Sequence, residues 1–445
     1  MDHKFTRRTV LKGVAGATAG AAAVAFGAPS RTFAAPAVVQ STGSKVTVTY
    51  WSSWGTANGD AMAALVKKFN ESQQDVEVKN QFQGTYEETA QKLTAALTSN
   101  TAPDLTVLSE VNWFKFYLNK SLVPLNDFIK ANEIDTSDYV DSFYNEGVRK
   151  DQLYWLSVAR STPLFYYNKQ LWSEAGLPDR APETYDELKE WAPKLVKKNG
   201  SKVSQYAFTH APADDYLAWY FQGTIWAFGG HYSDPQFNMT LTEPKALDAG
   251  NFYRDSVGEG WAHVSKDRMT DFYNGVTASI MQSTGSLGGI LKNIKFELGS
   301  GFLPKEAQPG CPTGGSGISI LASSPKEKQE AAFKFMAFLT TPENTTWWSQ
   351  TTGYMPVRKS AITSEEMKAY YEKNPNFKTA VDQLPTTSPQ DVARLYIPGG
   401  DQILGKGLER ITINQDETKP VFEDVSKELT REAKPIKEKV QAIEG

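Results

Sequence analysis

The sequence predicts an α/β fold organised in two lobes, each lobe a mixed sheet flanked by helices. Strand and helix patterns alternate early in the chain and again after Ser323. Such alternation builds an open parallel or mixed sheet with helices on both faces. The chain has 445 residues, which is more than one hydrophobic core usually holds. We therefore expect two lobes of ordinary domain size.

A cleaved export signal is predicted over residues 1–35. Arg7 and Arg8 stand in a Thr-Arg-Arg-Thr-Val-Leu-Lys run, which has the twin-arginine pattern, and an apolar, Ala/Gly-rich run follows at 13–27. Small residues near Ala34 suit a cleavage site, and the apolar run is too short to span a bilayer. The protein is therefore expected in the periplasm or another extracytoplasmic space, exported already folded through the twin-arginine pathway.

Composition narrows the classes of partner. Cys311 is the only cysteine, so neither an internal disulfide nor a lipid-attachment cysteine after the leader is possible. The formal net charge of −4 falls further once the basic leader is removed, and runs of Lys or Arg are absent from the rest of the sequence. An acidic chain of this kind is a poor candidate for binding nucleic acid or anionic lipid. We expect a soluble monomer with no nucleic-acid partner.

The first predicted elements are a strand and an amphipathic helix. Val46, Val48 and Tyr50 alternate with polar residues, as in a half-buried strand. Asn58 or Asp60 is expected to cap the helix that follows. The apolar face of that helix has i, i+3, i+4 and i+7 spacing: Met62, Leu65, Val66 and Phe69.

Three loops near the start of the chain are expected to form a binding site. A strand at 76–82, a helix through Leu93 and Leu97, and a strand at 105–108 continue the alternation. Ligands of open α/β sheets bind beyond the carboxyl ends of the strands. In this sequence those ends are 51–55, 84–87 and 109–112.

The middle of the chain has a different pattern before the alternation returns. Short aromatic and aliphatic runs at 153–159 and 163–167 precede Asn168, which is expected to open a helix. Further helices are predicted at 184–198 and 216–228, and a strand at 318–321. Ser324-Pro325-Lys326-Glu327 then has the pattern of a capping box with Pro at the first helical position. The helix it opens is expected to bury four residues: Ala332, Phe335, Met336 and Leu339.

Motifs of catalysis and of metal binding are absent from the sequence. The four histidines are scattered, and neither an HExxH, CxxC, P-loop nor Gly-x-Ser-x-Gly pattern occurs. Adjacent acids at Glu87/Glu88 and Asp214/Asp215 suit a solvated helix face better than a glycosidase pair. We predict no catalytic residue, no metal and no cofactor.

Aromatic residues make up 12% of the chain. Rings flanked by hydroxyl and carboxylate groups suit polyols and sugars, because C–H faces stack on the ring while hydroxyl groups find directed partners. Trp51, Trp54 and Trp219 are candidates for such contacts, although core packing is the commoner role for any single aromatic residue.

Several motifs occur together in one order and span nearly the whole chain after the leader. The sequence resembles the family 1 extracellular solute-binding proteins of ABC importers, and within them the glycerol-3-phosphate-binding members. The motifs are Gly84-Thr85-Tyr86-Glu87, Ser161-Thr162-Pro163-Leu164-Phe165-Tyr166-Tyr167-Asn168-Lys169, Phe272-Tyr273-Asn274-Gly275, Ser283-Thr284-Gly285-Ser286-Leu287, Gly314-Gly315 and Thr352-Gly353-Tyr354-Met355-Pro356.

The resemblance implies a clamshell in which two α/β lobes close over one ligand. We place the chain crossings near Arg160, Thr313 and Gly353. Lobe one is then 45–160 plus 313–353, and lobe two is 161–312 plus 354–445. Glycines near two crossings suit either hinges or ordinary turns at strand starts: Gly314, Gly315, Gly317 and Gly353.

The resemblance also implies a set of ligand contacts. Glu110 could accept hydrogen bonds from vicinal hydroxyls, while Ser283 and the Gly315 amide could hold oxyanion or hydroxyl oxygens. Two tyrosines would supply rings with polar tips. The complete set is Tyr86, Glu110, Ser161, Ser283, Gly315 and Tyr354.

The sequence departs from the family pattern where the phosphate would bind. An Arg expected two residues after a Gln is replaced by Leu404, and tryptophans expected near His210 are missing. Arg160 or Arg394 could substitute, although a surface or hinge role is also open for each. The expected function is that of a binding protein that delivers glycerol-3-phosphate, a glycerophosphodiester or a similar polyol to a membrane permease. The alternatives are a neutral mono- or oligosaccharide ligand and, more distantly, a secreted carbohydrate-active enzyme.

Overall fold

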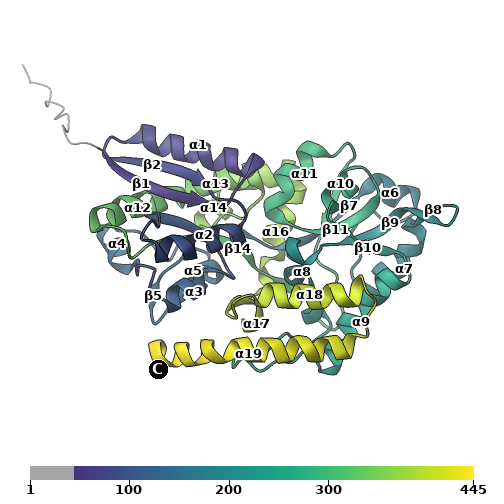
Figure 1. Cartoon of the computed structure of the whole chain (residues 1–445). Coiled ribbons are helices and arrows are strands. Elements are labelled where there is room, and N and C mark those ends of the chain that lie inside the picture. The colour runs from purple at the N-terminus through teal and green to yellow at the C-terminus, as the bar shows by residue number, and fades with distance from the viewer. Residues whose placement is uncertain (1–44) are drawn as a thin grey trace, which may run out of the picture. The chain divides into compact units, whose positions relative to one another are not determined.

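The computed structural model describes residues 45–445. The predicted export signal, with Arg7 and Arg8, lies outside the described residues. Within the described part, none of the helices combines the length and the apolar character that a membrane span requires. The fold is the predicted α/β architecture, with one mixed sheet in each of two lobes (Figure 1).

The first lobe is built on a sheet with the strand order β2-β1-β3-β14-β6. β1 pairs in parallel with β2 and β3, whereas β14 is antiparallel to β3 and β6. The carboxyl ends of β1 and β3 therefore meet at one edge of the sheet. Its strands are β1 (Val46–Ser52), β2 (Val76–Phe82), β3 (Leu105–Ser109), β6 (Leu156–Ser161) and β14 (Gly314–Ile320).

Helices pack on this sheet through apolar faces. α1 buries Met62, Leu65, Val66 and Phe69, the face expected from the spacing. The helices between β1 and β4 are α1 (Thr56–Ser72), α2 (Tyr86–Thr98), α3 (Trp113–Leu118), α4 (Asn126–Ala131) and α5 (Asp141–Asn145), and those that follow β14 directly are α12 (Lys326–Leu339) and α13 (Pro342–Thr352). A short hairpin joins α5 to β6 and consists of β4 (Val148–Arg149) and β5 (Gln152–Leu153).

The second lobe is built on a sheet with the strand order β10-β9-β11-β7-β12, and β8 pairs with β9 at the side. β9 is parallel to β10 and β11, while β7 is antiparallel to β11 and β12. Its strands are β7 (Pro163–Asn168), β8 (Lys197–Asn199), β9 (Lys202–His210), β10 (Ala262–Val264), β11 (Thr277–Ser283) and β12 (Leu298–Gly301).

Helix α8 lies in the hydrophobic core of the second lobe. Every residue of α8 (Leu217–Ala227) is buried, as expected for a helix that is apolar on all sides. The other helical segments between β7 and β12 are α6 (Lys169–Glu174), α7 (Tyr185–Leu195), η1 (Ala213–Asp215), α9 (Pro244–Gly258), α10 (Arg268–Tyr273), η2 (Thr284–Ser286) and α11 (Leu287–Asn293).

The last hundred residues are mostly helical and include a helix that touches both lobes. α19 packs on α18 and α9 and also on α3 of the first lobe (Figure 1). Its Ile436 joins a core cluster with Trp113 and Phe114. The segments in this region are α14 (Lys359–Ile362), α15 (Glu365–Lys373), α16 (Pro375–Gln383), η3 (Leu384–Thr386), α17 (Val392–Leu395), α18 (Gly400–Thr412) and α19 (Thr418–Glu444), with β15 (Thr387–Ser388) paired to β13 (Cys311–Pro312).

The chain changes sheet between β6 and β7 and again between β12 and β14, near the crossings expected at Arg160 and Thr313. At Gly353, the third expected crossing, α13 ends in a left-handed residue with φ +100°. The residue boundaries of the two lobes stay a prediction.

Three expected helix ends are wrong. α1 starts at Thr56 rather than at a cap on Asn58 or Asp60, because Gly55 is its N-cap. The capping box at Ser324 does not form: Pro325 is the N-cap of α12, and the Ser324 hydroxyl donates to Asp104 instead (2.7 Å). The helix expected over 184–198 ends at Leu195, because the chain turns into β8.

Candidate functional site

A cavity of about 280 Å³ lies where loops of both lobes meet. Loops after β1 and β3, the start of α2 and the start of β14 form one wall, and residues around η1, α8 and η2 form the other. The lining residues are Ser53, Trp54, Gly55, Asn58, Thr85, Tyr86, Glu110, Ser161, Asp215, Tyr216, Trp219, Tyr220, Gln282, Ser283, Gly285, Ser286, Gly315 and Tyr354.

All six residues that the sequence assigns to the ligand line this one cavity: Tyr86, Glu110, Ser161, Ser283, Gly315 and Tyr354. They come from six separate segments of the chain, and folding brings them together. Of the further candidates, Trp54 and Trp219 also line the cavity, whereas Trp51, Arg160 and Arg394 do not. Direct contact of any of these residues with a ligand stays a prediction.

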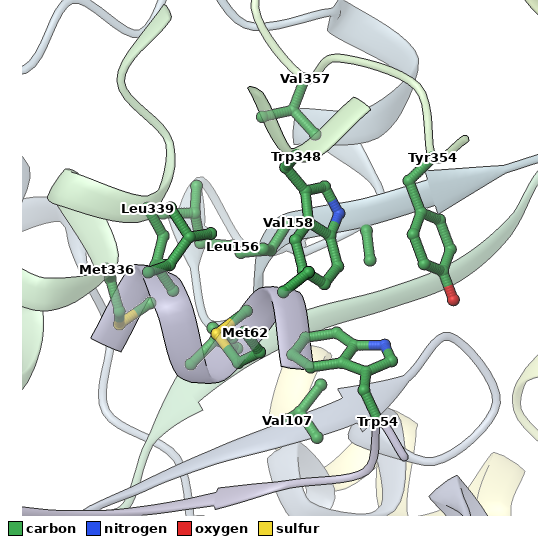
Figure 2. Packing of buried hydrophobic residues seen from close by; sticks show 14 of the residues in the cluster. Trp54, Met62, Val107, Leu156, Val158, Met336, Leu339, Trp348, Tyr354 and Val357 are labelled. Atoms are coloured by element: carbon green, nitrogen blue, oxygen red, sulfur yellow. The ribbon is translucent and has the colours of Figure 1, made fainter. Parts of the chain in front are cut away.

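A hydrogen-bonded aromatic group forms one side of the cavity. The Trp54 indole N–H donates to the Tyr86 hydroxyl (2.9 Å), which donates to Ser316 (3.0 Å) and lies 3.4 Å from the Tyr354 hydroxyl. Trp348 packs edge-on against the ring of Trp54 (centroids 5.3 Å apart) and stacks on the ring of Tyr354 (5.8 Å), as Figure 2 shows. Burial raises the pKa of Tyr86 and of Tyr354 above the ordinary tyrosine value, so both hydroxyls stay protonated and can donate.

Glu110 is held on β14 by the backbone of Gly315. The Gly315 amide donates to the Glu110 carboxylate (3.1 Å), and the Glu110 amide donates to the Gly315 carbonyl (3.1 Å). Gly315 has φ +114°, and a Cβ there would lie 2.1 Å from the Ala159 carbonyl oxygen. Only glycine fits this conformation and this approach, so the carboxylate has a fixed place at the end of β3.

Arg394 lies directly behind Glu110. Its guanidinium is fully buried and pairs with Glu110 (3.2 Å) and with Asp401 (2.6 Å). It also donates to Gln390, while its Nη2 has no hydrogen-bond partner. Arg394 lines an adjacent cavity of about 260 Å³, which shares Tyr86 and other residues with the first.

A second buried arginine supports the opposite wall. Arg268 donates to the carboxylate of Asp215 (2.5 Å) and to the Tyr220 hydroxyl (3.0 Å). Tyr220 in turn donates to the Gln282 side-chain oxygen, which also accepts the Ser283 amide (2.7 Å). Arg268 is 1% exposed, and through this relay it fixes the orientation of the residues that face the cavity.

Arg160 and Trp51 have partners away from the cavity. The Arg160 guanidinium is fully buried, pairs with Glu146 and lies over the rings of Trp155 and Phe143. The Trp51 indole N–H donates to Gln81 on the neighbouring strand (3.0 Å). Both residues therefore stabilise the first lobe.

Sequence reasoning missed several lining residues of the second lobe. Asp215 and Tyr216 lie at the start of α8, where Tyr216 adopts a left-handed conformation (φ 62°). A strained non-glycine residue of this kind is typical of functional sites, but a sequence pattern does not reveal it. Gln282 lies on β11 directly before Ser283. Its position next to the Ser-Thr-Gly-Ser motif was a signal that could have identified Gln282 as a lining residue.

The cavity is equipped for binding polar solutes. Its wall offers tyrosine and serine hydroxyl groups beside two carboxylates, Glu110 and Asp215. Each carboxylate is paired with a buried arginine and accepts a hydrogen bond from it. Groups of three or more metal-binding side chains are absent from residues 45–445.

Comparison with known proteins gives a family match. The sequence model of the bacterial extracellular solute-binding proteins matches residues 64–379. The sn-glycerol-3-phosphate-binding periplasmic protein UgpB of Escherichia coli (strain K12) is 29% identical over 361 residues, which are 77% of this chain and 81% of that protein.

Solved structures have the same fold. The crystal structure of UgpB from Mycobacterium tuberculosis in complex with glycerophosphocholine matches with a TM-score of 0.82 and 40% sequence identity, over 87% of this chain and 98% of that one. The cyclic α-maltosyl-1,6-maltose binding protein from Arthrobacter globiformis matches with a TM-score of 0.73 over 88% of this chain and 100% of that one. At 24% identity, the second likeness shows the fold alone.

Proposed function

Because this chain belongs to the family of bacterial extracellular solute-binding proteins, we propose that it captures a glycerophosphodiester or glycerol-3-phosphate and delivers it to an ABC importer. Relatives named for glycerol-3-phosphate and for a glycerophosphocholine complex support this ligand class. The protein acts outside the cytoplasmic membrane and performs no catalytic step. The arginine partners of Glu110 and Asp215 support binding rather than hydrolysis.

The paired Glu110 and Arg394 carry the proposal. A carboxylate suits the vicinal hydroxyls of glycerol, and a guanidinium suits a phosphate oxygen. Arg394 holds an N–H without a hydrogen-bond partner next to Glu110, so one ligand could use both groups. Arg394 would supply the guanidinium that the sequence lacks at Leu404. The Leu404 side chain is buried in the hydrophobic core of the second lobe.

A diester is the better ligand on grounds of charge. Arg394 already faces two carboxylates, Glu110 and Asp401, so a phosphate monoester dianion would add two negative charges to a group that is net negative. Desolvating such a charge is costly unless it is paired. A diester carries one negative charge, so its desolvation costs less.

Capture proceeds by closure of the two lobes. We take lobe one as 45–160 plus 313–353 and lobe two as 161–312 plus 354–445. The Asn58 side chain donates across the cavity to the Gly285 carbonyl (3.1 Å), so the two walls already touch at its edge. A ligand that contacts both walls favours the closed state by its differential contacts.

Titration calorimetry on the exported chain tests this function. Glycerophosphocholine should bind more tightly than glycerol-3-phosphate, and maltose should give no saturable heat. Arg394→Gln should weaken glycerophosphocholine by about tenfold or more, because hydrogen bonds to charged groups contribute about 1.5–3 kcal/mol. Arg394→Lys retains the charge and tests whether the forked donor geometry matters.

A matched control is Arg410→Gln. Arg410 lies on the exposed side of α18 and pairs with Asp416 and Asp424, so its removal should leave affinity unchanged. Tightest binding by maltose or another neutral sugar would replace this function with the saccharide alternative, which Trp54 and Trp219 in the cavity wall would then serve. Tightest binding by glycerol-3-phosphate would contradict the preference for a diester.

A further inference from the structure

One flank of the molecule carries a group of contacts that joins the two lobes outside the cavity. With the lobes taken as above, Arg149 on β4 and Phe114 on α3 belong to lobe one, whereas Tyr396 and Glu444, the last residue of α19, belong to lobe two. Arg149 and Glu444 line neither the cavity of the candidate site nor the adjacent one. A substitution at either position therefore removes no side chain that lines the site.

The ion pair between Arg149 and Glu444 has a forked geometry. The Arg149 Nε donates to one Glu444 carboxylate oxygen (2.7 Å), and its Nη2 donates to the other. Forked pairs of arginine and carboxylate add geometric specificity to the attraction between the charges. The two side chains are 24% and 16% exposed, so solvent screens this pair less than a pair on the open surface.

Aromatic rings complete this contact between the lobes. The Arg149 guanidinium carbon lies 5.2 Å from the centroid of the Phe114 ring and 5.7 Å from that of Tyr396. The two ring centroids are 4.2 Å apart, so the ring contact itself also joins lobe one to lobe two. A guanidinium at this distance from an aromatic ring is attracted by its face. We call Arg149, Glu444, Phe114 and Tyr396 the interlobe clasp.

The interlobe clasp is connected to the site through two short stretches of chain. Phe114 lies four residues after Glu110, and Tyr396 lies two residues after Arg394. On the same flank Ile436 of α19 belongs to one hydrophobic cluster with Phe114. The contacts of the clasp therefore influence how the segments that carry Glu110 and Arg394 lie against each other.

We propose that Arg149 is a positioning residue for ligand capture, and that the interlobe clasp stabilises the closed form of the two lobes without touching the ligand. This inference rests on the proposed function, since it needs lobes that open and close around a solute. A contact made only in the closed form increases the closed population, and the apparent affinity of any ligand that needs this form rises with that population. The clasp therefore acts independently of the chemistry of the ligand.

The test compares Arg149→Gln with the double substitution Arg149→Glu and Glu444→Arg, which reverses the ion pair. Calorimetry uses glycerophosphocholine and glycerol-3-phosphate as probes. Arg149→Gln should weaken both probes by the same factor, about threefold, as expected for a partly exposed ion pair. The reversed pair should recover part of the affinity that Arg149→Glu alone loses. Stopped-flow tryptophan fluorescence should show the loss in the dissociation rate, where most effects of contact substitutions appear.

Small-angle X-ray scattering provides a readout that needs no ligand. The radius of gyration of ligand-free Arg149→Gln should exceed that of the unmodified protein, because the population shifts toward the open form. Thermal unfolding of the same samples shows whether the substitution also destabilises the fold. A purely structural role would lower the melting temperature without changing the radius of gyration.

Arg180→Gln is the matched control. Arg180 makes the same forked pair with Glu187 (2.7 and 2.6 Å) and lies 4.8 Å from the centroid of the Trp191 ring, but all three residues belong to lobe two. The control should leave both the affinity and the radius of gyration unchanged.

Unchanged affinity or an unchanged radius of gyration in Arg149→Gln would overturn the interlobe clasp. An equal loss of affinity in the Arg180→Gln control would overturn it as well. Binding of neither probe to the unmodified protein would overturn the proposed function instead, and the scattering measurement would still decide on the clasp. The two failures are therefore distinguishable.

Discussion

Two buried arginines explain why acidic side chains line a binding cavity at fixed positions. Arg268 and Arg394 lie behind opposite walls, and each pairs with a carboxylate that faces the cavity. A buried charge is tolerated only when it is paired and hydrogen-bonded. Each arginine therefore needs its acid, and each acid is oriented before a ligand arrives.

Substitution of Glu110 separates binding from folding. Glu110→Gln keeps the side-chain shape and should weaken ligand by about tenfold or more, since a charged acceptor is lost. Glu110→Ala should also lower the melting temperature of the ligand-free protein, because it removes an acidic partner of buried Arg394. Calorimetry and thermal unfolding measure the two effects. Glu372→Gln on α15, which lines neither cavity, is the control; unchanged affinity in Glu110→Gln would make Glu110 a purely structural residue.

At the residue scale, sequence motifs pointed to residues that line one cavity but not to the arginines behind them. Five of the six predicted residues belong to a quoted short motif, and Glu110 lies in the segment 109–112 that follows a predicted strand. Arg268 contacts Asp215, which lies 53 positions earlier in the chain, and such a pair leaves no local pattern. Leu404 shows the same limit of local patterns. The arginine that pairs with Glu110 is Arg394, at a different position from the one where an arginine was expected.

At the scale of elements, Asp391 anchors the short helix that carries Arg394. Asp391 is the N-cap residue of α17. Its carboxylate accepts hydrogen bonds from Gln222 (2.9 Å), Trp226 (3.1 Å) and the Tyr232 amide (2.7 Å). All three donors belong to α8 or the loop after it, so α17 is held against α8.

His231 makes this anchor sensitive to pH. Its hydrogen bond to Asp391 (3.2 Å) raises the pKa of His231 above the ordinary value of 6.5, and partial burial opposes this only in part. A histidine whose pKa is raised by folding stabilises the protein fully below about pH 6.5, and this contribution is lost as the pH rises through the folded value.

The His231→Gln variant tests this dependence. The loss of unfolding free energy should be larger at about pH 5.5 than at about pH 8.5, and it should stay below about 1 kcal/mol because the ring is half exposed. Urea unfolding at the two pH values measures it. His263→Gln should show the opposite trend, because burial lowers the pKa of His263. A loss from His231→Gln that is equal at both pH values would contradict the role assigned to the ring.

Element boundaries could be predicted where periodicity decided them. The strand expected at 76–82 is β2 (Val76–Phe82), and the predicted buried face of α12 is buried in the structure. Helix starts were missed because Asn58 and Ser324 use their side chains for tertiary contacts with Gly285 and Asp104. A capping residue competes with such partners, and sequence alone does not show which one prevails.

At the scale of the whole molecule, α19 connects the two lobes away from the cavity. Near its start α19 packs on α9 and α18, and near its end Glu444 pairs with Arg149 beside Phe114 and Tyr396. The two-lobed architecture could be predicted from the strand–helix alternation and the length. The path of α19 could not, because an amphipathic helix does not specify which two surfaces it will cover.

The export route belongs to the same scale. Lysine in place of both Arg7 and Arg8 should leave unprocessed, folded precursor in the cytoplasm, because the twin-arginine pair is the signal that is recognised. Cell fractionation with immunoblotting in a bacterial host measures the distribution of precursor and processed protein. The substitution keeps the charge of the leader, so normal secretion of the variant would assign the protein to another route.

The two tryptophans in the cavity wall give the protein a built-in optical signal. Trp54 and Trp219 have their indole N–H groups fixed by Tyr86 (2.9 Å) and by the Thr313 carbonyl (3.0 Å). Because both rings also line the cavity, their emission is expected to respond to what occupies it. We expect a ligand that displaces water beside these rings to shift their fluorescence, so that the unlabelled protein would act as a sensor for its own solute. Trp54→Phe and Trp219→Phe would show which ring gives the signal.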